Sequence, residues 1–204
     1  KRIGMPELPE VETVSVALSK IINDSKVTKI EILRKDLRWN IKKNLKVELE
    51  QDIFKKPYRR GKYILIPTYK GNIFLIHLGM SGQIKISTNN SNLSKHDHVI
   101  INIKTRENKI FVITYNDPRR FGYIDLFNYK ETEDHFLLKK LGVEPFSNSF
   151  TADYLKKKFK KRSKCIKNVL MDQSIIAGIG NIYASEILHR ARINPLRSVD
   201  SLNK

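Results

Sequence analysis

The sequence predicts an α+β protein in which a β-sandwich or β-barrel comes first and a helical region follows. Between Val27 and Phe127, short stretches of β-branched and aromatic residues alternate with polar residues, and Gly, Asn or Pro separates the stretches. Apolar residues recur at helical spacing before Val27 and again after Thr151. With 204 residues, the chain can bury a core in one or two domains.

The first element is a helix, followed by strands. Helical spacing of apolar residues begins after Pro9 and predicts a helix that ends near Asn23. The mostly alternating stretches then predict strands, because alternate side chains of a strand point to opposite faces. These strands are expected at residues 27–33, 61–67, 72–78, 82–87, 98–105, 109–115 and 122–127.

The second half of the chain is predicted to be helical. A short helix closed by Gly142 is expected at residues 131–142, followed by a linker with Pro and Ser. Thr151 is a suitable N-cap for the next helix. Helices are expected at residues 152–161, 165–172 and 181–193.

The net charge of +18 suggests a polyanionic partner. The chain has 39 Lys and Arg residues against 21 Asp and Glu residues, an excess typical of nucleic-acid-binding proteins. The sequence is also rich in Ile, Lys and Asn, and an AT-rich genome would raise the lysine content in the same way. The densest basic cluster, residues 156–167, fits a DNA-binding surface and also a solvated helix face. Charge alone leaves both explanations open.

Several classes of protein are excluded by composition. No apolar run approaches the ~20 residues that cross a bilayer, and the N-terminus lacks the apolar segment of a secretory signal. We therefore expect a cytosolic protein without membrane contact. Cys165 is the single cysteine, so the chain has no internal disulfide and no cysteine-based zinc finger. His96 and His98 are too few ligands for a metal site, and His98 is expected to be structural.

The stretch from Met5 to Glu12 reads like the start of a protein, although four residues precede it. Removal of Met5 would leave Pro6 with a free secondary amine. Terminal amines titrate near ~7.7 to 8.0 and lysine near ~10.4, so a terminal amine is the better nucleophile at neutral pH. Attack on a sugar carbon would give a cationic iminium, and Glu7 can give or take a proton. A lone Pro–Glu pair equally fits an acidic, proline-capped helix start.

Six motifs carry a resemblance to a known family. They are, in order, MPELPEVETV, RRGKYILI, IHLGMSG, KHDHV, TYNDPRRFG and LMDQSIIAGIGNIYASEIL. From Met5 to its C-terminus the chain resembles bacterial formamidopyrimidine-DNA glycosylases, which repair oxidised purines such as 8-oxoguanine. The resemblance implies an N-terminal β-sandwich with flanking helices, followed by a helical domain that contains the start of a helix-two-turn-helix. Double-stranded damaged DNA would lie in the cleft between these domains.

The resemblance also implies a domain plan and an activity. A catalytic β-sandwich domain is expected at residues 5–130, a connecting helix and linker at 131–150, and an incomplete helical DNA-binding domain at 151–204. Residues 1–4 are expected to be an upstream extension or a cloning remnant. The implied reaction is excision of 8-oxoguanine or formamidopyrimidines, then strand cleavage at the abasic site through an imine. The protein is expected to be a monomer in the bacterial cytoplasm, associated with the nucleoid.

Three catalytic residues follow from the resemblance. Pro6 is implied as the nucleophile at C1′ of the damaged nucleotide, and Glu7 as the proton donor that helps to open the sugar ring. Lys62 matches a family lysine that takes part in catalysis and touches phosphate. Without its motif, Lys62 would be one of many surface lysines. Glu10 is expected to support Glu7 or the helix start.

Other residues are implied to fill the hole that an extruded base leaves in the duplex. Extrusion costs stacking energy unless side chains occupy that hole. The family uses the positions of Met80, Arg119 and Phe121 for this purpose. Met80 and Phe121 stand beside glycines and are expected on loops, whereas core packing would explain a Met or Phe without that context.

The implied contacts with DNA come from both halves of the chain. They are His96, Arg119, Lys167 and Asn181. Glycines before Asn181 would expose backbone amides at a helix N-terminus, an arrangement that suits phosphate. His77 is expected either to contact phosphate or to be packed. Ser163 stands where many relatives have a cation, and the expected substitutes are Lys161, Arg162 or Lys164.

Two features depart from the family pattern. Residues 1–4, if they stay attached, make the Pro6 nitrogen an amide, which is not a nucleophile. The family also continues past the position of Lys204 with the rest of the helix-two-turn-helix, a base-recognition loop and a four-cysteine zinc finger with a catalytic arginine. We therefore expect no cofactor in this chain. We also expect the chain to be a fragment or the product of a decayed gene.

Two rival functions follow from these departures. One is a related glycosylase for oxidised pyrimidines, against which the set Met80, Arg119 and Phe121 argues. The other is an inactive truncated remnant that binds DNA without chemistry. Processing that exposes the Pro6 amine would separate an enzyme from this remnant.

Overall fold

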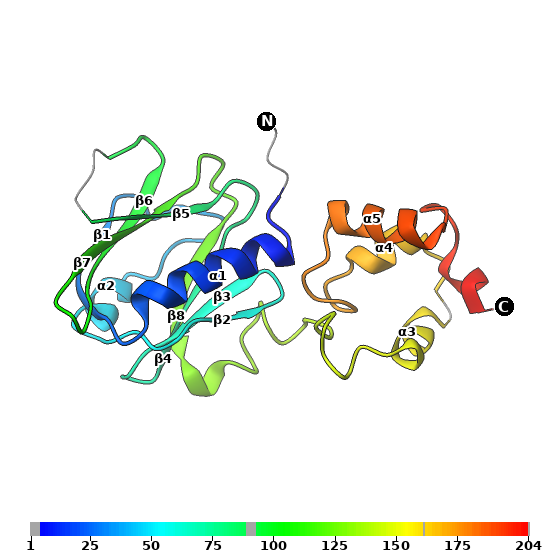
Figure 1. Cartoon of the computed structure of the whole chain (residues 1–204), viewed down its shortest axis with the longest axis horizontal. Helices are drawn as coiled ribbons and strands as arrows, with labels where there is room; N and C mark the ends of the chain where they lie inside the picture. Colours follow the sequence, from blue (N-terminus) through cyan, green and yellow to red (C-terminus); the bar gives the residue numbers. More distant parts are fainter. Residues whose placement is uncertain (1–4, 89–92, 161, 204) are drawn as a thin grey trace. The chain divides into compact units, whose positions relative to one another are not determined.

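The protein is described by a computed structural model over residues 5–88, 93–160 and 162–203. The expected extension at residues 1–4 and the cation Lys161 lie outside the described residues. The chain divides into two compact units (Figure 1). The sandwich unit comprises the chain up to Arg59 together with Tyr63–Glu133, and the helical unit comprises Arg60–Lys62 with the chain from Asp134 onward.

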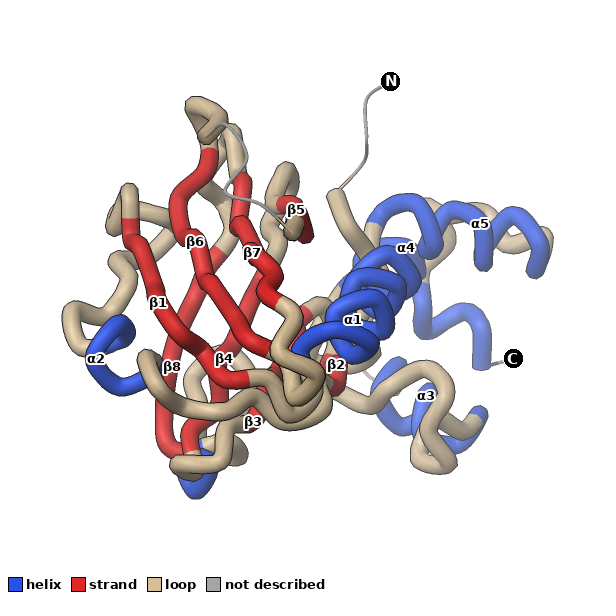
Figure 2. Tube along the Cα trace, turned by 60° about the vertical axis from the view of Figure 1, so that its left-hand side comes forward, coloured by secondary structure: helices blue, strands red, loops and turns tan. Residues whose placement is uncertain are grey.

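The sandwich unit is built from two four-stranded sheets. One sheet has the strand order β1-β6-β7-β5 and the other has the order β2-β3-β4-β8. Figure 2 shows β1, β6 and β7 in front of β4 and β8. The pairs β1/β6, β6/β7, β5/β7, β3/β4 and β4/β8 are antiparallel. The strands are β1 (Lys26–Ile32), β2 (Tyr58–Arg60), β3 (Tyr63–Pro67), β4 (Asn72–His77), β5 (Gln83–Ser87), β6 (Asp97–Lys104), β7 (Ile110–Asn116) and β8 (Tyr123–Asn128).

The helix α1 (Leu8–Ile22) packs one face against the core of the sandwich. Its buried side chains include Val11, Leu18 and Ile22, which recur at helical spacing. The same core contains Phe54 and Phe74, whose ring centroids lie 5.9 Å apart, together with side chains from both sheets. Each such buried apolar side chain contributes about 1.5–3 kcal/mol. This core holds the strand ends from which the loops described below leave.

The predicted strands are confirmed, with boundaries displaced by one or two residues. The elements that the sequence does not predict include β2 and the one-turn helix α2 (Leu45–Leu49). The three residues of β2 are too few to show alternation. A helix as short as α2 depends on tertiary packing, here the full burial of Leu45 and Leu49.

The helical unit has its own apolar core. Its helices are α3 (Ala152–Phe159), α4 (Ile166–Met171) and α5 (Asn181–Ala191), followed by the 3₁₀ helix η2 (Val199–Asn203). Thr151 is confirmed as the N-cap of α3, because its Oγ1 accepts a hydrogen bond of 3.1 Å from the Tyr154 backbone N–H. Among the described residues, no helix is both long enough and apolar enough to cross a bilayer.

The prediction of a helix at residues 131–142 is wrong. The structure has the 3₁₀ helix η1 (Tyr129–Glu131) and then a series of turns. Gly142 does not close a helix, because its N–H donates to the Gln173 carbonyl at 2.8 Å. Val143 forms a parallel bridge with Ile176. The backbone of the expected linker therefore pairs with a distant part of the helical unit.

Candidate active site and DNA-binding loops

The N-terminal segment places Pro6 directly before a capped helix. Glu7 is the N-cap of α1 and is only 1% exposed. Its backbone N–H donates to Glu10 Oε2 at 3.0 Å, in a capping box that fixes the entry of the chain into the helix. Pro6 is half-buried. The Pro6 nitrogen and the Glu7 carboxyl group are thus one residue apart on an ordered backbone, as a nucleophile and its proton donor would be.

Two loops of the sandwich unit are in direct contact. One joins β4 to β5 and carries Met80, and the other joins β7 to β8 and carries Arg119 and Phe121. The Ser81 hydroxyl accepts a hydrogen bond of 3.1 Å from the Arg119 backbone N–H. Gly79 has φ +61°, and a Cβ atom there would lie 2.4 Å from the Phe121 carbonyl carbon. Glycine is therefore required for the two loops to approach each other this closely.

The side chains at the tips of these loops are not part of the core. Phe121 is 43% exposed, and the Arg119 guanidinium carbon lies 4.9 Å from the centroid of its ring. Met80 is half-buried and lies outside the core cluster. Core packing therefore does not account for Phe121. An exposed ring, a cation and a flexible thioether on adjoining loops are suited to enter a stack of bases.

A hollow of about 570 Å³ lies beside the second loop. Its lining by described residues includes Arg38, Arg119 and Arg120 together with the acidic Asp36. Asp36 receives a hydrogen bond of 2.6 Å from Arg120, and hydrogen bonding to Arg34 lowers the pKa of the Asp36 carboxyl group. The excess of guanidinium groups suits a phosphate backbone.

The histidines near these loops have different surroundings. His96 is half-buried, and its carbonyl accepts a hydrogen bond of 3.0 Å from the Asp117 N–H. His98 is 3% exposed, with Nε2 2.8 Å from the Asp117 carbonyl oxygen, so its role is structural as expected. His77 is half-buried, and its ring lies 4.8 Å from that of Tyr63. The structure thus brings the segments of Met80, His96, Arg119 and Phe121 together.

Lys62 belongs to the helical unit, whereas Pro6 and Glu7 belong to the sandwich unit. The turn that carries Lys62 is held by Glu144, whose Oε1 accepts from the Gly61 N–H at 2.7 Å and from Arg60 at 2.8 Å. Arg60 also donates to the Gly142 carbonyl at 2.6 Å. Lys62 itself is only 9% exposed. A lysine held in this way is a positioned charge and not a mobile surface residue.

The start of α5 presents the features expected of a phosphate site. Gly180 is the N-cap, and Asn181 is the exposed first residue of the helix. Gln173 holds the preceding loop, because its side chain donates to the Ile179 carbonyl at 2.6 Å and accepts from the Gly178 N–H at 2.8 Å. The positive end of the helix dipole and the N–H groups of its first turn therefore lie on an ordered loop.

The remaining predicted cations of the helical unit lie near α4. Lys167 is half-buried in the first turn of that helix. Of the proposed substitutes for a cation at Ser163, Arg162 lies 3.7 Å from Asp172 Oδ2 and Lys164 is exposed. Lys164 is therefore more readily available to a phosphate than Arg162.

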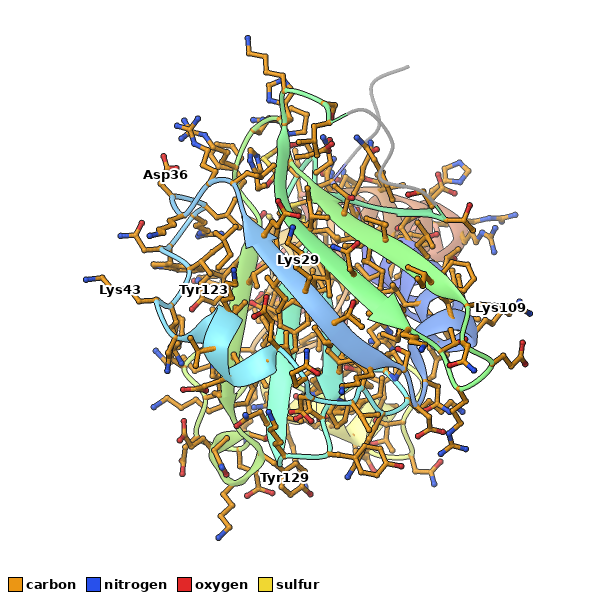
Figure 3. All side chains as sticks on the ribbon, turned by 90° about the vertical axis from the view of Figure 1, so that its left-hand side faces the viewer. Lys29, Asp36, Lys43, Lys109, Tyr123 and Tyr129 are labelled. Carbon is orange, nitrogen blue, oxygen red and sulfur yellow. The ribbon has the colours of Figure 1, made fainter. Side chains whose placement is uncertain are left out.

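Part of the positive charge is dispersed over the sandwich unit. Figure 3 shows Lys43 and Lys109 on opposite sides of this view and Lys29 on the strand between them. Lys29 pairs with Glu31 at 2.8 Å, and Lys109 pairs with Glu107 at 2.6 Å. Such exposed pairs contribute little to stability, because water and salt screen their charges. This dispersed charge is what a general bias toward lysine would produce. The hypothesis of DNA binding therefore depends on the two loops, Lys62 and the start of α5 described above.

The described residues offer no metal centre. They contain no group of three or more His, Cys, Asp or Glu side chains arranged to hold a metal ion. Cys165, the single cysteine of the chain, is half-buried at the N-cap of α4. A four-cysteine zinc site such as the family carries therefore does not fit the residues of this chain.

Three residues that support the candidate site are not predicted from the sequence. Asp117, Glu144 and Gln173 each hold a loop through contacts with residues distant in sequence or with neighbouring backbone. Asp117 precedes a proline and reads as an ordinary turn residue, and Glu144 stands in an expected linker. A local signal exists only for Gln173, which lies before a glycine-rich turn.

Both parts of the chain match known protein families. Residues 5–124 match the family model of the formamidopyrimidine-DNA glycosylase N-terminal domain, and residues 141–204 match that of the formamidopyrimidine-DNA glycosylase H2TH domain. The formamidopyrimidine-DNA glycosylase of Bartonella henselae is 41% identical over 206 residues, with 97% of this chain and 71% of the relative covered.

Solved structures of similar proteins contain DNA. The Lactococcus lactis formamidopyrimidine-DNA glycosylase bound non-covalently to DNA with an abasic site has a TM-score of 0.87 and 33% identity, with 96% of this chain and 73% of that chain covered. A complex of the wild-type Lactococcus lactis enzyme with DNA that contains an oxidised pyrimidine has a TM-score of 0.87 and 34% identity. It covers 96% of this chain and 72% of that chain.

Proposed function

The chain belongs to the formamidopyrimidine-DNA glycosylase family, and we infer that it excises damaged bases from DNA in base-excision repair. Its partner is damaged DNA. The observation that carries this function is the exposed Phe121 ring, with the Arg119 guanidinium beside it, on a loop that contacts the loop of Met80. Such a group has no use in the core and a clear use in a duplex that has lost a base from its stack.

The chemistry is assigned to the N-terminal segment. The Pro6 amine attacks C1′ of the damaged nucleotide, and the bond from C1′ to the base breaks. The base leaves with the bonding electron pair and takes up a proton, while the attacking nitrogen loses its own proton. Glu7 donates a proton to the ring oxygen of the sugar, so that the ring opens and an iminium forms between Pro6 and C1′. The cationic nitrogen then favours loss of a proton from C2′ and of the phosphate from C3′. Lys62 supplies a positive charge near phosphate.

The substrate is proposed to be an oxidised purine, 8-oxoguanine or a formamidopyrimidine. Support comes from Met80, Arg119 and Phe121, which form the set of side chains that the purine-specific enzymes use. A relative was crystallised with an oxidised pyrimidine in its DNA, so the test must include both classes of lesion. The reaction uses only side chains and a terminal amine, and we assign no cofactor to this chain. We also propose that the protein acts as a monomer in the bacterial cytoplasm, at the nucleoid, where its DNA substrate lies.

DNA binding should depend strongly on salt. If about four to six phosphates are neutralised, the affinity for duplex DNA should fall about 10²- to 10³-fold between ~50 and ~200 mM salt. Fluorescence anisotropy with labelled duplexes measures this fall. An affinity that does not change with salt would contradict the assignment of Lys62, Arg119 and Lys167 to the phosphate backbone.

Excision on defined duplexes separates the rival functions. A protein processed to begin at Pro6 should release 8-oxoguanine at least about tenfold faster than an oxidised pyrimidine, because about 1.4 kcal/mol of discrimination suffices for that ratio. The reverse order would favour the pyrimidine enzyme. Salt-dependent binding without release of either base would identify a non-catalytic DNA-binding protein.

Replacement of Phe121 with Ala should affect extrusion more than strand cleavage. An abasic site has no base to remove from the stack, so the variant should lose about 10- to 100-fold in excision and less than about threefold in abasic-site cleavage. Gel assays on the two substrates measure both rates. Ile110→Ala is the control, because Ile110 is also exposed, at 58%, but lies at the start of β7. Equal losses on both substrates would remove the void-filling role.

A further inference from the structure

Asp117 lies beneath the two loops that carry the void-filling side chains, and it is fully buried. Its Oδ2 accepts from the Gly122 backbone N–H at 2.8 Å and from the Tyr115 hydroxyl at 3.3 Å. The Tyr115 hydroxyl shares its proton with the His77 carbonyl oxygen, also at 3.3 Å. Its Oδ1 accepts from the Ser81 hydroxyl. Burial and the negative charge of Asp117 raise the pKa of the Tyr115 phenol, which therefore keeps its proton and remains a donor.

The same residue fixes neighbouring backbone through its main-chain atoms. The Asp117 N–H donates to the His96 carbonyl at 3.0 Å, and its carbonyl accepts from the Arg120 N–H at 3.2 Å and lies 2.8 Å from His98 Nε2. A buried carboxylate without partners would be strongly unfavourable, and here three donors compensate it. The loop that begins at Asp117 is therefore fixed at its base.

Ser81 extends this arrangement to the loop of Met80. Its hydroxyl donates to Asp117 and accepts from the Arg119 N–H at 3.1 Å, so one hydroxyl joins both loops. Gly122 packs equally closely, because a Cβ atom there would lie 1.6 Å from the Tyr115 hydroxyl oxygen. The close approach of Gly79 to Phe121 completes the contact. Met80, Arg119 and Phe121 are thus presented by two loops that share one set of hydrogen bonds.

Exposed side chains cannot be oriented by a core, so their backbone must be fixed from below. We propose that Asp117 is a positioning residue that locks the two loops into one rigid wedge, so that Met80, Arg119 and Phe121 enter the DNA stack together. The inference rests on the void-filling role in the proposed function. A wedge that is ordered before it meets DNA loses less conformational entropy when it replaces an extruded base.

The test is Asp117→Asn in the full-length protein. The amide has a single acceptor oxygen where the carboxylate has two, and its NH₂ group must face one of the three donors. The expected result is a fall in 8-oxoguanine excision of about 10- to 100-fold, as for a misplacement of about 1 Å at a reacting site. Abasic-site cleavage should change less than about threefold. A fluorescent base analogue opposite the lesion should report slower extrusion.

Two further variants separate positioning from stability. Asp52→Asn controls for the loss of a buried negative charge, because Asp52 is 2% exposed. Its Oδ1 accepts from two backbone N–H groups at 2.7 and 3.2 Å, whereas its Oδ2 has no hydrogen-bond partner among the described residues, so the amide loses no acceptor there. Excision rates are compared at a temperature well below the thermal unfolding midpoint of every variant. Ser81→Ala should cause a smaller loss of excision, and the Ser81→Ala/Asp117→Asn pair should lose no more than Asp117→Asn alone, because both act through one network.

Four outcomes decide between a positioning role and a folding role for Asp117. Selective loss of excision in Asp117→Asn, absent from Asp52→Asn, supports the positioning role. Equal losses on both substrates, or equal losses in both Asn variants, overturn it and leave Asp117 with a folding role only. If Phe121→Ala retains full excision, the void-filling function fails and the inference fails with it. If Phe121→Ala is impaired and Asp117→Asn is not, only the inference fails.

Discussion

A protein that begins at Pro6 should be trapped on abasic-site DNA by borohydride, and the same protein with residues 1–5 attached should not. In the first form the nitrogen is a secondary amine, which adds to the aldehyde of the opened sugar to give a reducible iminium. In the second form it is an amide without a nucleophilic lone pair. The yield of adduct should differ by about 10³-fold or more, as when a nucleophile is removed from other enzymes.

The site of attachment is as informative as the yield. Lys62 is the competing amine, and it lies in a turn of the helical unit where it is only 9% exposed. Peptide mapping of the reduced adduct should therefore find the sugar on Pro6. A Lys62→Ala variant that begins at Pro6 should still form the adduct. An adduct on Lys62, or equal yields from both N-terminal forms, would show that the Pro6 amine is not the nucleophile.

Replacement of Glu7 with Gln should reduce excision by about 10²- to 10⁴-fold, the usual contribution of a positioned acid or base. The amide has the shape and the acceptor oxygen of the carboxylate but no proton to transfer to the ring oxygen. The Glu7 side chain accepts the N–H of the third helical residue in the capping box, and glutamine keeps an acceptor oxygen for this bond, so the substitution should leave the helix in place. Single-turnover excision of 8-oxoguanine measures the loss, and circular dichroism checks the fold.

Glu10→Gln is the matched control for this loss. Glu10 lies three residues later in the same capping box, and its Oε2 accepts the Glu7 N–H at 3.0 Å. Glutamine retains an acceptor at this position, since capping boxes use Glu or Gln. Excision should therefore change less than about threefold in this variant. Similar losses in both variants would mean that the helix start matters and that Glu7 is not the proton donor.

The strands and the capped helices were predictable because their signals are local. In β4, for example, the residues from Ile73 to Ile76 are apolar and lie between Gly71 and Gly79. Thr151 likewise marks the start of α3, because it caps the helix three residues before Tyr154. The family, and with it Pro6, Glu7 and the void-filling set, follows from motifs whose order is preserved along the chain. Each of these features depends on residue types at short spacing.

The segment at residues 131–142 shows where local patterns mislead. Its composition fits a short helix, but the backbone of Gly142 and Val143 hydrogen-bonds to residues about 30 positions away. Backbone groups must be paired when they are buried, and a sequence pattern does not record whether the partner is four residues away or thirty. The tertiary contact decides between helix and turn.

The supports of the site also depend on distant partners. Ser81 and Asp117 are 36 residues apart, and Gly61 and Glu144 are 83 residues apart. Composition and periodicity describe which faces are buried, and they explain the sandwich, its covering helix and the exposed loops. Glu144 fixes the turn of Lys62 and Asp117 fixes the base of the wedge only after the folded chain has brought each carboxylate to N–H or hydroxyl donors. This arrangement is selected because donors and carboxylates that are removed from water without a partner cost free energy.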